Sequence, residues 1–316
     1  MKKIFLLVMA ALGATGTVHA AKLDYSKVSA QANWLAHADF DALRKSTVGA
    51  FIIAKLKEDP EAAKGINTLK AIFGIDVDAL SSFTASGRGE PKKGILSLKG
   101  GFDAERLQAM VELNESYSAQ KHGGTVIHLI DKHTGDPKAL AFTAKDEVVG
   151  STSAGYTKHG LDVANGKAPS LEPKGIHKAL VNVLPHPVLT VTADVKGVAE
   201  LNKPQGGPEA VIIQKTDAIG LVVGETGGML MAVAVLEAAD EETAVHVENI
   251  ARGFTSLLAL GGDIDPELAE LLAKTKTSVA RAGSTVQGKL GIDTKVVKEQ
   301  IAKEMAKKKK AEPRLD

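Results

Sequence analysis

Short apolar strands alternate along this chain with helices that begin at an aspartate, and the same order occurs twice. The aspartate carboxylates can accept hydrogen bonds from the first free N–H groups of the helices that follow them. The first half is expected to contain a strand at 32–38, a helix from Asp39 to Glu58, a helix from Pro60 to Gly74, strands at 80–86 and 94–98, a helix from Asp103, strands at 125–130, 139–144 and 147–151, and a helix at 153–163. The second half is expected to contain a strand at 188–193, a helix from Asp194, strands at 218–223 and 229–236, a helix from Asp240, a helix from Pro266 to Lys274, strands at 277–282 and 285–291, and a helix from Asp293.

This order predicts an α+β fold of two related units, each a small antiparallel sheet with helices packed on one face. The Pro60–Gly74 helix has no counterpart in the second half and is predicted to be an insertion. A Pro-rich stretch with a short helix at 176–183 separates the halves, and it leaves open whether their sheets join. The predicted organisation is a signal peptide at 1–20, a first unit at 21–166, a connector at 167–187, a second unit at 188–306 and a basic tail at 307–316.

Three segments of the first half carry a resemblance to a known kind of protein. They are Ala36-His37-Ala38-Asp39-Phe40-Asp41-Ala42-Leu43, Phe73-Gly74-Ile75-Asp76 and Gly101-Phe102-Asp103-Ala104-Glu105. In this order and behind a signal peptide, the pattern resembles uncharacterised exported bacterial proteins built of tandem α+β units. The resemblance implies an architecture and no particular activity.

The first twenty residues predict export. Lys2 and Lys3 precede an apolar run that is too short to span a bilayer, and Val18-His19-Ala20 is a small-x-small ending of the kind that signal peptidase cleaves. Cleavage after Ala20 would leave the mature protein in the periplasm or secreted. The absence of Cys excludes a lipid-anchored cysteine, disulfides and thiolate metal sites.

The composition argues against several classes of partner. Removing residues 1–20 takes away two lysines, so the formal charge falls from +1 to −1. A near-neutral chain with few aromatics lacks the basic surface and stacking residues of nucleic-acid-binding proteins. No later apolar run predicts a transmembrane segment. We therefore expect neither nucleic acid nor a membrane span.

Three clustered histidines, His122, His128 and His133, suggest a metal site at first sight. Residues along a strand are about 3.3 Å apart, so His122 and His128 are separated by far more than zinc ligation allows unless the chain reverses sharply. No acidic third ligand is obvious at helical spacing. The expectation is therefore no metal and no cofactor.

The other candidates for catalysis are also better explained by structure. Ser118 and Lys121 match Ser-x-x-Lys, but His133-Thr-Gly135 follows too closely to be the third motif of penicillin-recognising enzymes. His37 is expected at the edge of the core, since its counterpart in the second half is Thr192, and His246 at the margin of an apolar helix stripe. Glu90 and Glu225 are expected at polar hairpin tips. No catalytic residue is predicted.

The last helix has two readings. Val297, Ile301 and Met305 form an apolar seam, with Lys303 and Lys307–Lys310 around its end. The helix is expected to dock on its own unit with a solvated tail, and the alternative is weak contact with an anionic surface.

The function expected from these features is a non-enzymatic binding or structural role in the cell envelope or secreted fraction. The alternatives are a hydrolase whose site is assembled from dispersed residues, and a carrier that holds an apolar small molecule between sheet and helices.

Overall fold

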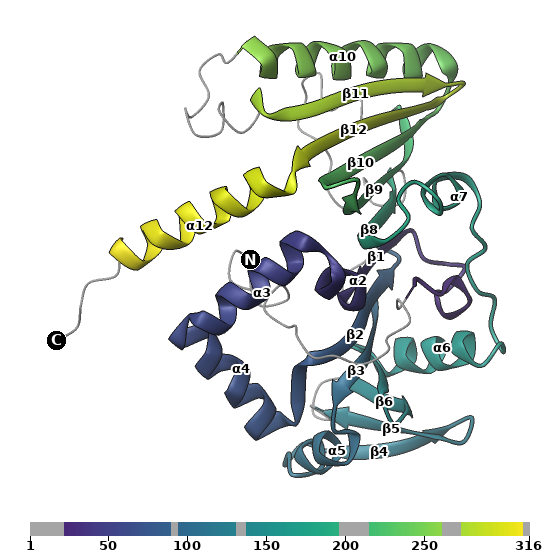
Figure 1. Ribbon diagram of the computed structural model, residues 1–316. Helices are drawn as coiled ribbons and strands as arrows, with labels where there is room; N and C mark the ends of the chain where they lie inside the picture. Colours follow the sequence, from purple (N-terminus) through teal and green to yellow (C-terminus); the bar gives the residue numbers. More distant parts are fainter. Residues whose placement is uncertain (1–21, 90–93, 131–136, 196–214, 261–272, 312–316) are drawn as a thin grey trace.

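In the described part of the chain, twelve strands form a single antiparallel sheet that spans both halves (Figure 1). The computed structural model describes residues 22–89, 94–130, 137–195, 215–260 and 273–311. The strand order is β11-β12-β10-β9-β8-β1-β2-β3-β7-β6-β5-β4, and β1 pairs with β8 at the junction of the two halves. The expectation of two small sheets is therefore corrected, because this central pairing joins them into one.

The strands fall where the sequence pattern placed them, and several, such as β2 and β9, are longer than it suggested. Their bounds are Trp34–Asp39 (β1), Ile75–Gly87 (β2), Gly94–Phe102 (β3), Ser118–His122 (β4), Thr125–Ile130 (β5), Lys138–Ala144 (β6), Glu147–Ser151 (β7), Pro187–Asp194 (β8), Thr216–Thr226 (β9), Met229–Ala238 (β10), Thr275–Ala282 (β11) and Thr285–Asp293 (β12). The sequence pattern missed β4, whose polar sequence Ser-Ala-Gln-Lys-His carries no apolar alternation. Pairing with β5 supplies the hydrogen bonds that make it a strand.

Helices cover both faces of the sheet, whereas the sequence predicted one covered face. The helices are η1 (Tyr25–Lys27), α2 (Phe40–Lys45), α3 (Thr47–Glu58), α4 (Pro60–Phe73), α5 (Ala104–Glu112), α6 (Ala154–Ala164), α7 (Gly175–Leu180), α10 (Glu241–Leu260) and α12 (Thr294–Ala311). Strand β10 shows the arrangement: Leu236 packs in a cluster with α10, whereas Val233 and Val235 pack with α7. Alternate residues of a strand point to opposite faces, so α10 and α7 lie on opposite sides.

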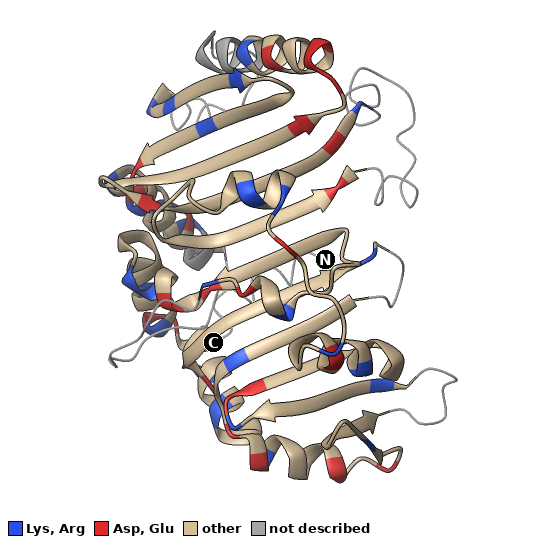
Figure 2. Cartoon of the chain, turned by 90° about the vertical axis from the view of Figure 1, so that its right-hand side faces the viewer, with Lys and Arg blue, Asp and Glu red and all other residues tan. Residues whose placement is uncertain are grey.

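The two faces have separate apolar cores. On one face, which we call the α3 face, Phe40, Leu43 and Ile53 of α2 and α3 pack on Val77 and Leu80 of β2. On the opposite face, the α6 face, Ile176 and Leu180 of α7 pack on β9 and β10, and Leu161 of α6 packs on β5 and β6. The sheet is therefore buried from both sides over its middle strands. Figure 2 views the α6 face, where charged residues gather on helices and strand ends and few lie on the strands.

Aspartates begin the helices as the sequence predicted. The carboxylate of Asp39 accepts from the N–H of Ala42 at 2.8 Å, Asp103 accepts from Arg106 at 3.0 Å, and Asp240 accepts from Thr243 at 2.6 Å. At the other end of α4, Gly74 adopts φ 67°, a left-handed conformation that favours glycine and ends the helix.

Two details of the first-half helices differ from expectation. The single helix expected from Asp39 to Glu58 is broken at Ser46, whose extended backbone ends α2 and whose hydroxyl accepts from the N–H of Gly49 to cap α3. On α4, Ile66 and Leu69 pack on the core, but Ile72 and Phe73 are 49% and 39% exposed. The expected apolar face of α4 is therefore only partly buried.

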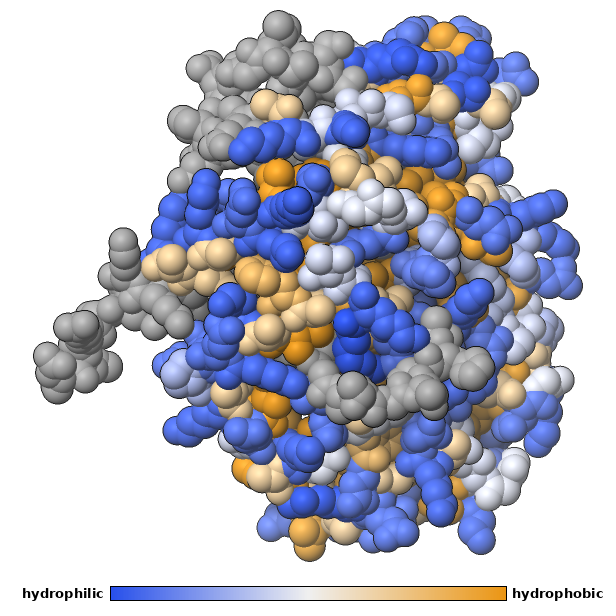
Figure 3. All heavy atoms as spheres, viewed as in Figure 1, coloured by the Kyte–Doolittle hydropathy of each residue, from blue (hydrophilic) through white to orange (hydrophobic). Residues whose placement is uncertain are grey.

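The last helix, α12, lies on the α3 face and contacts α3, with the Lys298 ammonium 5.9 Å from the centre of the Phe51 ring. Figure 3 has the same view as Figure 1, and apolar and hydrophilic side chains are intermixed over the surface that it shows. Among the described helices none combines the length and apolarity that a membrane crossing needs. Helices expected from Asp194 and from Pro266 to Lys274, and the stop expected at Gly261-Gly262, lie largely or wholly outside the described residues.

Candidate functional site

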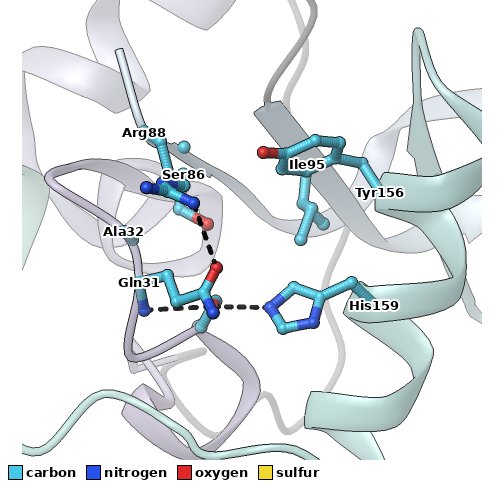
Figure 4. Close-up of a pocket in the computed structure, with 9 residues that line it drawn as sticks. Gln31, Ala32, Ser86, Arg88, Ile95, Tyr156 and His159 are labelled. Atoms are coloured by element: carbon cyan, nitrogen blue, oxygen red, sulfur yellow. Dashed lines mark hydrogen bonds between the residues drawn. The ribbon is translucent and has the colours of Figure 1, made fainter. Parts of the chain in front are cut away.

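A small hollow on the α6 face brings together polar side chains from distant parts of the chain (Figure 4). Its walls come from the turn after η1, the end of β2, the start of β3 and one side of α6. The lining residues are Ser29, Gln31, Ala32, Ser86, Gly87, Arg88, Ile95, Tyr156 and His159. The hollow measures about 230 Å³ when the open space at its mouth is counted, and its inner part has room for roughly one water molecule.

Backbone pairing fixes the N-terminal wall. The N–H of Asn33 donates to the carbonyl of Gly87 at 2.8 Å, and the N–H of Ala30 donates to the carbonyl of Pro169 at 3.0 Å. Ser29 also forms an isolated bridge with Ser170. The turn is therefore held between the end of β2 and the connector, which places Ser29 and Gln31 beside α6.

Close packing of α6 on the sheet fixes the opposite wall. A Cβ at Gly160 would lie 3.2 Å from Cγ2 of Ile95 and 3.4 Å from Cγ1 of Val149, which is closer than most Cβ contacts. The absence of a side chain at Gly160 therefore lets α6 pack closely against β3 and β7. The preceding residue, His159, and Tyr156, one turn earlier, lie along the side of α6 that faces the hollow (Figure 4).

Ser29 and His159 form a hydrogen-bonded pair in this hollow. The Ser29 hydroxyl is 2.8 Å from Nε2 of His159, and the same hydroxyl accepts from the N–H of Gln31 at 3.1 Å. Ser29 is only 6% exposed. Among the described residues no carboxylate hydrogen-bonds the other ring nitrogen of His159, so the pair lacks the third group that orients the base in a hydrolytic triad.

Arg88 carries the formal positive charge of the hollow. Its Nη1 lies 3.5 Å from the side-chain oxygen of Gln31, a long contact, and within the described part of the chain no carboxylate pairs with it. The Tyr156 hydroxyl points across the hollow toward the side on which Arg88 lies (Figure 4). No Asp or Glu is among the lining residues. The hollow is therefore rich in donors and lacks a negative group.

Two of the three clustered histidines, His122 and His128, lie on opposite faces of the sheet. His122 of β4 pairs with Asp162 of α6 at 2.8 Å, on the α6 face. His128 points to the other face, where its Nδ1 is 3.1 Å from the Tyr117 hydroxyl and its ring packs edge-on against Phe142. Burial lowers the pKa of His128, and the nearby charge of Glu112 partly offsets this shift by raising the pKa. His133 lies outside the described residues, and among those described no group of three metal-ligating side chains forms.

The other sequence candidates fall on structural positions. Ser118 and Lys121 lie on β4, where residues three apart point to opposite faces, so the pair does not have the helical geometry of Ser-x-x-Lys enzymes. His37 is 5% exposed in the middle of β1, and its Nδ1 is 2.9 Å from the Thr84 hydroxyl. His246 is exposed on α10 rather than at the margin of a buried stripe.

Glu225 lies near the tip of the β9–β10 hairpin as expected, while Glu90 falls outside the described residues. The Glu225 carboxylate accepts from the backbone N–H groups of Thr47 and Val48, both at 2.6 Å. It thus caps α3 of the first half from the second half. This contact could not be predicted from the sequence, because Glu225 and α3 are far apart in the chain.

The hollow could not be predicted from the sequence either. Its residues come from four stretches that share no motif or spacing, and Arg88 and Tyr156 read as ordinary turn and helix residues. A second pair was missed for the same reason: Tyr25 and His177 meet edge-to-face, with ring centres 5.7 Å apart. Burial raises the pKa of Tyr25 and lowers that of His177.

Comparison with known proteins finds only low similarity. No protein family matches the chain, and no curated protein does. Two solved structures of TP0453, a Treponema protein, are similar to it. Crystal form III has a TM-score of 0.47 and 11% identity, covering 90% of this chain and 99% of that chain, and crystal form I has a TM-score of 0.46 and 11% identity, covering 90% and 98%.

Proposed function

We propose that this chain is an exported, non-enzymatic binding protein of the cell envelope or secreted fraction, with the hollow beside α6 as its ligand site. The observation that carries the proposal is the convergence of Arg88, Tyr156 and His159 on one accessible hollow. Convergent polar groups around a concavity are the usual mark of a ligand site. The lack of a carboxylate behind His159, within the described residues, favours binding over hydrolysis.

Native mass spectrometry tests the proposal on the protein purified from its own envelope fraction. The wild-type protein is expected to carry an added mass, and a variant that fills the hollow, Ala32→Leu, is expected to lack it. Lys99→Gln, an exposed change on β3 away from the lining residues, serves as the control and should keep the added mass. A bare wild-type protein, or an added mass that Ala32→Leu retains, would contradict the proposed site.

A hydrolase is the second candidate, and the Ser29–His159 hydrogen bond of 2.8 Å is the observation in its favour. A serine nucleophile needs a positioned base within such a distance. Labelling with a fluorophosphonate decides between the two functions: a hydrolase would be labelled at Ser29 and a Ser29→Ala variant would not. The binding proposal expects neither protein to be labelled.

We propose further that export proceeds through cleavage after Ala20, on the strength of the basic, apolar and small-residue order of residues 1–20. N-terminal sequencing of exported material should begin Ala21-Lys22-Leu23. Recovery of an intact Met1 on exported protein would contradict both the cleavage site and the location.

We also propose that the two halves arose by duplication. Outward from the central pair, one half runs β1-β2-β3-β7-β6 and the other runs β8-β9-β10-β12-β11, which is the same order with β5 and β4 added to the first half. Asp103 and Asp240 each begin the helix that follows the hairpin. An experimental structure that places a short helix directly after Asp194, and no equivalent of α4, would support the proposal, and a different path there would count against it.

A further inference from the structure

We propose that the hollow recognises a carboxylate group, carried by a small molecule or by the C-terminus of a peptide, with the rest of the ligand lying outside. This inference rests on the proposed binding function and names the chemistry of its ligand. The inventory of groups in the hollow is the starting point. A guanidinium, a phenol hydroxyl, a side-chain amide and an imidazole meet there without an acidic neighbour among the lining residues.

Two nearby charged pairs are already formed, whereas within the described residues no carboxylate pairs with Arg88. Lys27 forms an ion pair with Glu147 at 2.7 Å, and His122 hydrogen-bonds Asp162 at 2.8 Å, both near α6. Within the described residues Arg88 makes only the long contact to Gln31. An arginine that is exposed and lacks a carboxylate partner can offer two parallel N–H donors to an incoming anion.

The remaining donors lie where a bound carboxylate would need them. The Tyr156 hydroxyl points across the hollow toward the Arg88 side, and no described group hydrogen-bonds it (Figure 4). The side-chain amide of Gln31 offers a further donor. Its oxygen contacts Arg88, whereas its nitrogen makes no hydrogen bond among the described residues and can donate to an anion. Three donors from three segments therefore surround the mouth of the hollow.

Charge favours a carboxylate over a phosphate. The inner part of the hollow has room for roughly one water molecule, so it admits a single ligand oxygen, and the rest of the ligand lies outside. A phosphate dianion would need more positive charge than a single guanidinium supplies, whereas a planar carboxylate matches the fork of one arginine. Ile95, Ala32 and Gly87 add an apolar wall that suits the carbon atom next to a carboxylate.

Titration of ¹⁵N-labelled protein tests the inference. The probes are N-acetylglycine, a tripeptide with a free C-terminus, the uncharged N-acetylglycinamide, and inorganic phosphate. Both carboxylates are expected to shift the amide signal of Gly87 and the Nε–H signal of Arg88, and the uncharged amide is expected to leave them in place. The relative affinities of the small acid and the tripeptide show which source of carboxylate the site accepts better.

Three variants connect the shifts to the proposed donors. Arg88→Gln should weaken carboxylate binding by about tenfold or more, because it removes a charge-assisted pair. Tyr156→Phe should weaken binding by a smaller factor, about threefold to tenfold, because it removes one neutral donor. Lys99→Gln removes the same charge as Arg88→Gln from an exposed site on β3 and should change affinity less than twofold. Circular dichroism melts confirm that each variant is folded.

The outcomes separate this inference from the function on which it rests. Equal binding of N-acetylglycinamide, stronger binding of phosphate, or an equal loss in Lys99→Gln would overturn the carboxylate assignment while leaving a binding protein. The assignment would also be wrong if no probe bound although native mass spectrometry found an added mass that Ala32→Leu removes. Absence of that added mass would instead overturn the proposed function.

Discussion

A buried ion pair in α2 shows what a single residue contributes to this fold. Asp41 is 1% exposed and pairs with Arg44, which also donates to the carbonyl of Leu80 at 2.6 Å. One oxygen of Asp41 and one nitrogen of Arg44 have no partner among the described residues. The pair is therefore an obligate one, since removing either member leaves the other charged and buried.

We predict that Arg44→Met lowers the free energy of unfolding by about 3–5 kcal/mol, because it leaves Asp41 unpaired in the core. Urea denaturation measures the change. The control Lys55→Met breaks the exposed pair between Lys55 and Glu58 and should cost less than about 1 kcal/mol. The double variant Arg44→Met, Asp41→Leu should recover much of the loss. A cost below about 1 kcal/mol for Arg44→Met would show that Asp41 tolerates burial alone.

We also predict that no metal supports the structure. His122 and His128 point to opposite faces of the sheet, so no ion can bridge them. Thermal melts recorded with and without EDTA should overlap. A melting temperature that falls by several degrees in the presence of EDTA would contradict this prediction and would point to a metal site that includes these histidines or His133.

At the scale of the element, the cap of α10 should make stability depend on pH. The Thr243 side chain and the backbone N–H of the same residue, which donates to the Asp240 carboxylate at 2.6 Å, lower the pKa of that carboxyl. A carboxyl with a lowered folded-state pKa stabilises the fold above its unfolded pKa, and this contribution is lost as the pH falls through the folded value. Asp240 therefore supports the helix at neutral pH but not in strong acid.

We predict that Asp240→Asn lowers the urea midpoint at pH 7, with the difference from wild type shrinking as the pH falls below about 4, the ordinary range for aspartate. Denaturation curves at a series of pH values test this. Glu61→Gln, which changes an exposed acid in the first turn of α4, is the matched control. A difference that is constant from neutral pH to strong acid would mean that the charge of Asp240 has no part in the cap.

At the scale of the molecule, the two halves are connected by more than the chain. The pairing of β1 with β8 runs through five residue pairs, Glu225 caps α3 of the other half, and α12 packs on the same helix. Val188 of β8 also packs against the core that Phe40 and Leu43 form with β2. Opening either half would therefore expose the core of the other.

We predict a single cooperative unfolding transition for the mature chain. Calorimetry should give equal calorimetric and van 't Hoff enthalpies. A proline at Val191, in the middle of β8, should weaken the central pairing and accelerate hydrogen exchange in both halves. Glu225→Gln is a milder probe of the same connection and should speed exchange mainly in α3. Two resolved transitions, or faster exchange confined to β8–β12, would show that the halves are stable independently.

Local signals in the sequence determined most of the elements. The caps at Asp39, Asp103 and Asp240 and the glycine that ends α4 depend on hydrogen bonds within a few residues, so the pattern of residues is enough to predict them. The expected strands were also found, because period-two alternation is a local property. Strand β4 was not predicted, because its sequence has no such alternation and its hydrogen bonds come from pairing with β5.

The tertiary structure alone decided how these elements combine. Nothing in the sequence of β1 or β8 selects the other as a partner, so the single sheet and its second covered face could not be read from it. The hollow lined by Arg88, Tyr156 and His159 depends on the same long-range packing, since Gly160 must let α6 approach β3 before those side chains meet. Capping and alternation act over a few residues, whereas sheet order and the candidate site arise from contacts between residues far apart in the chain.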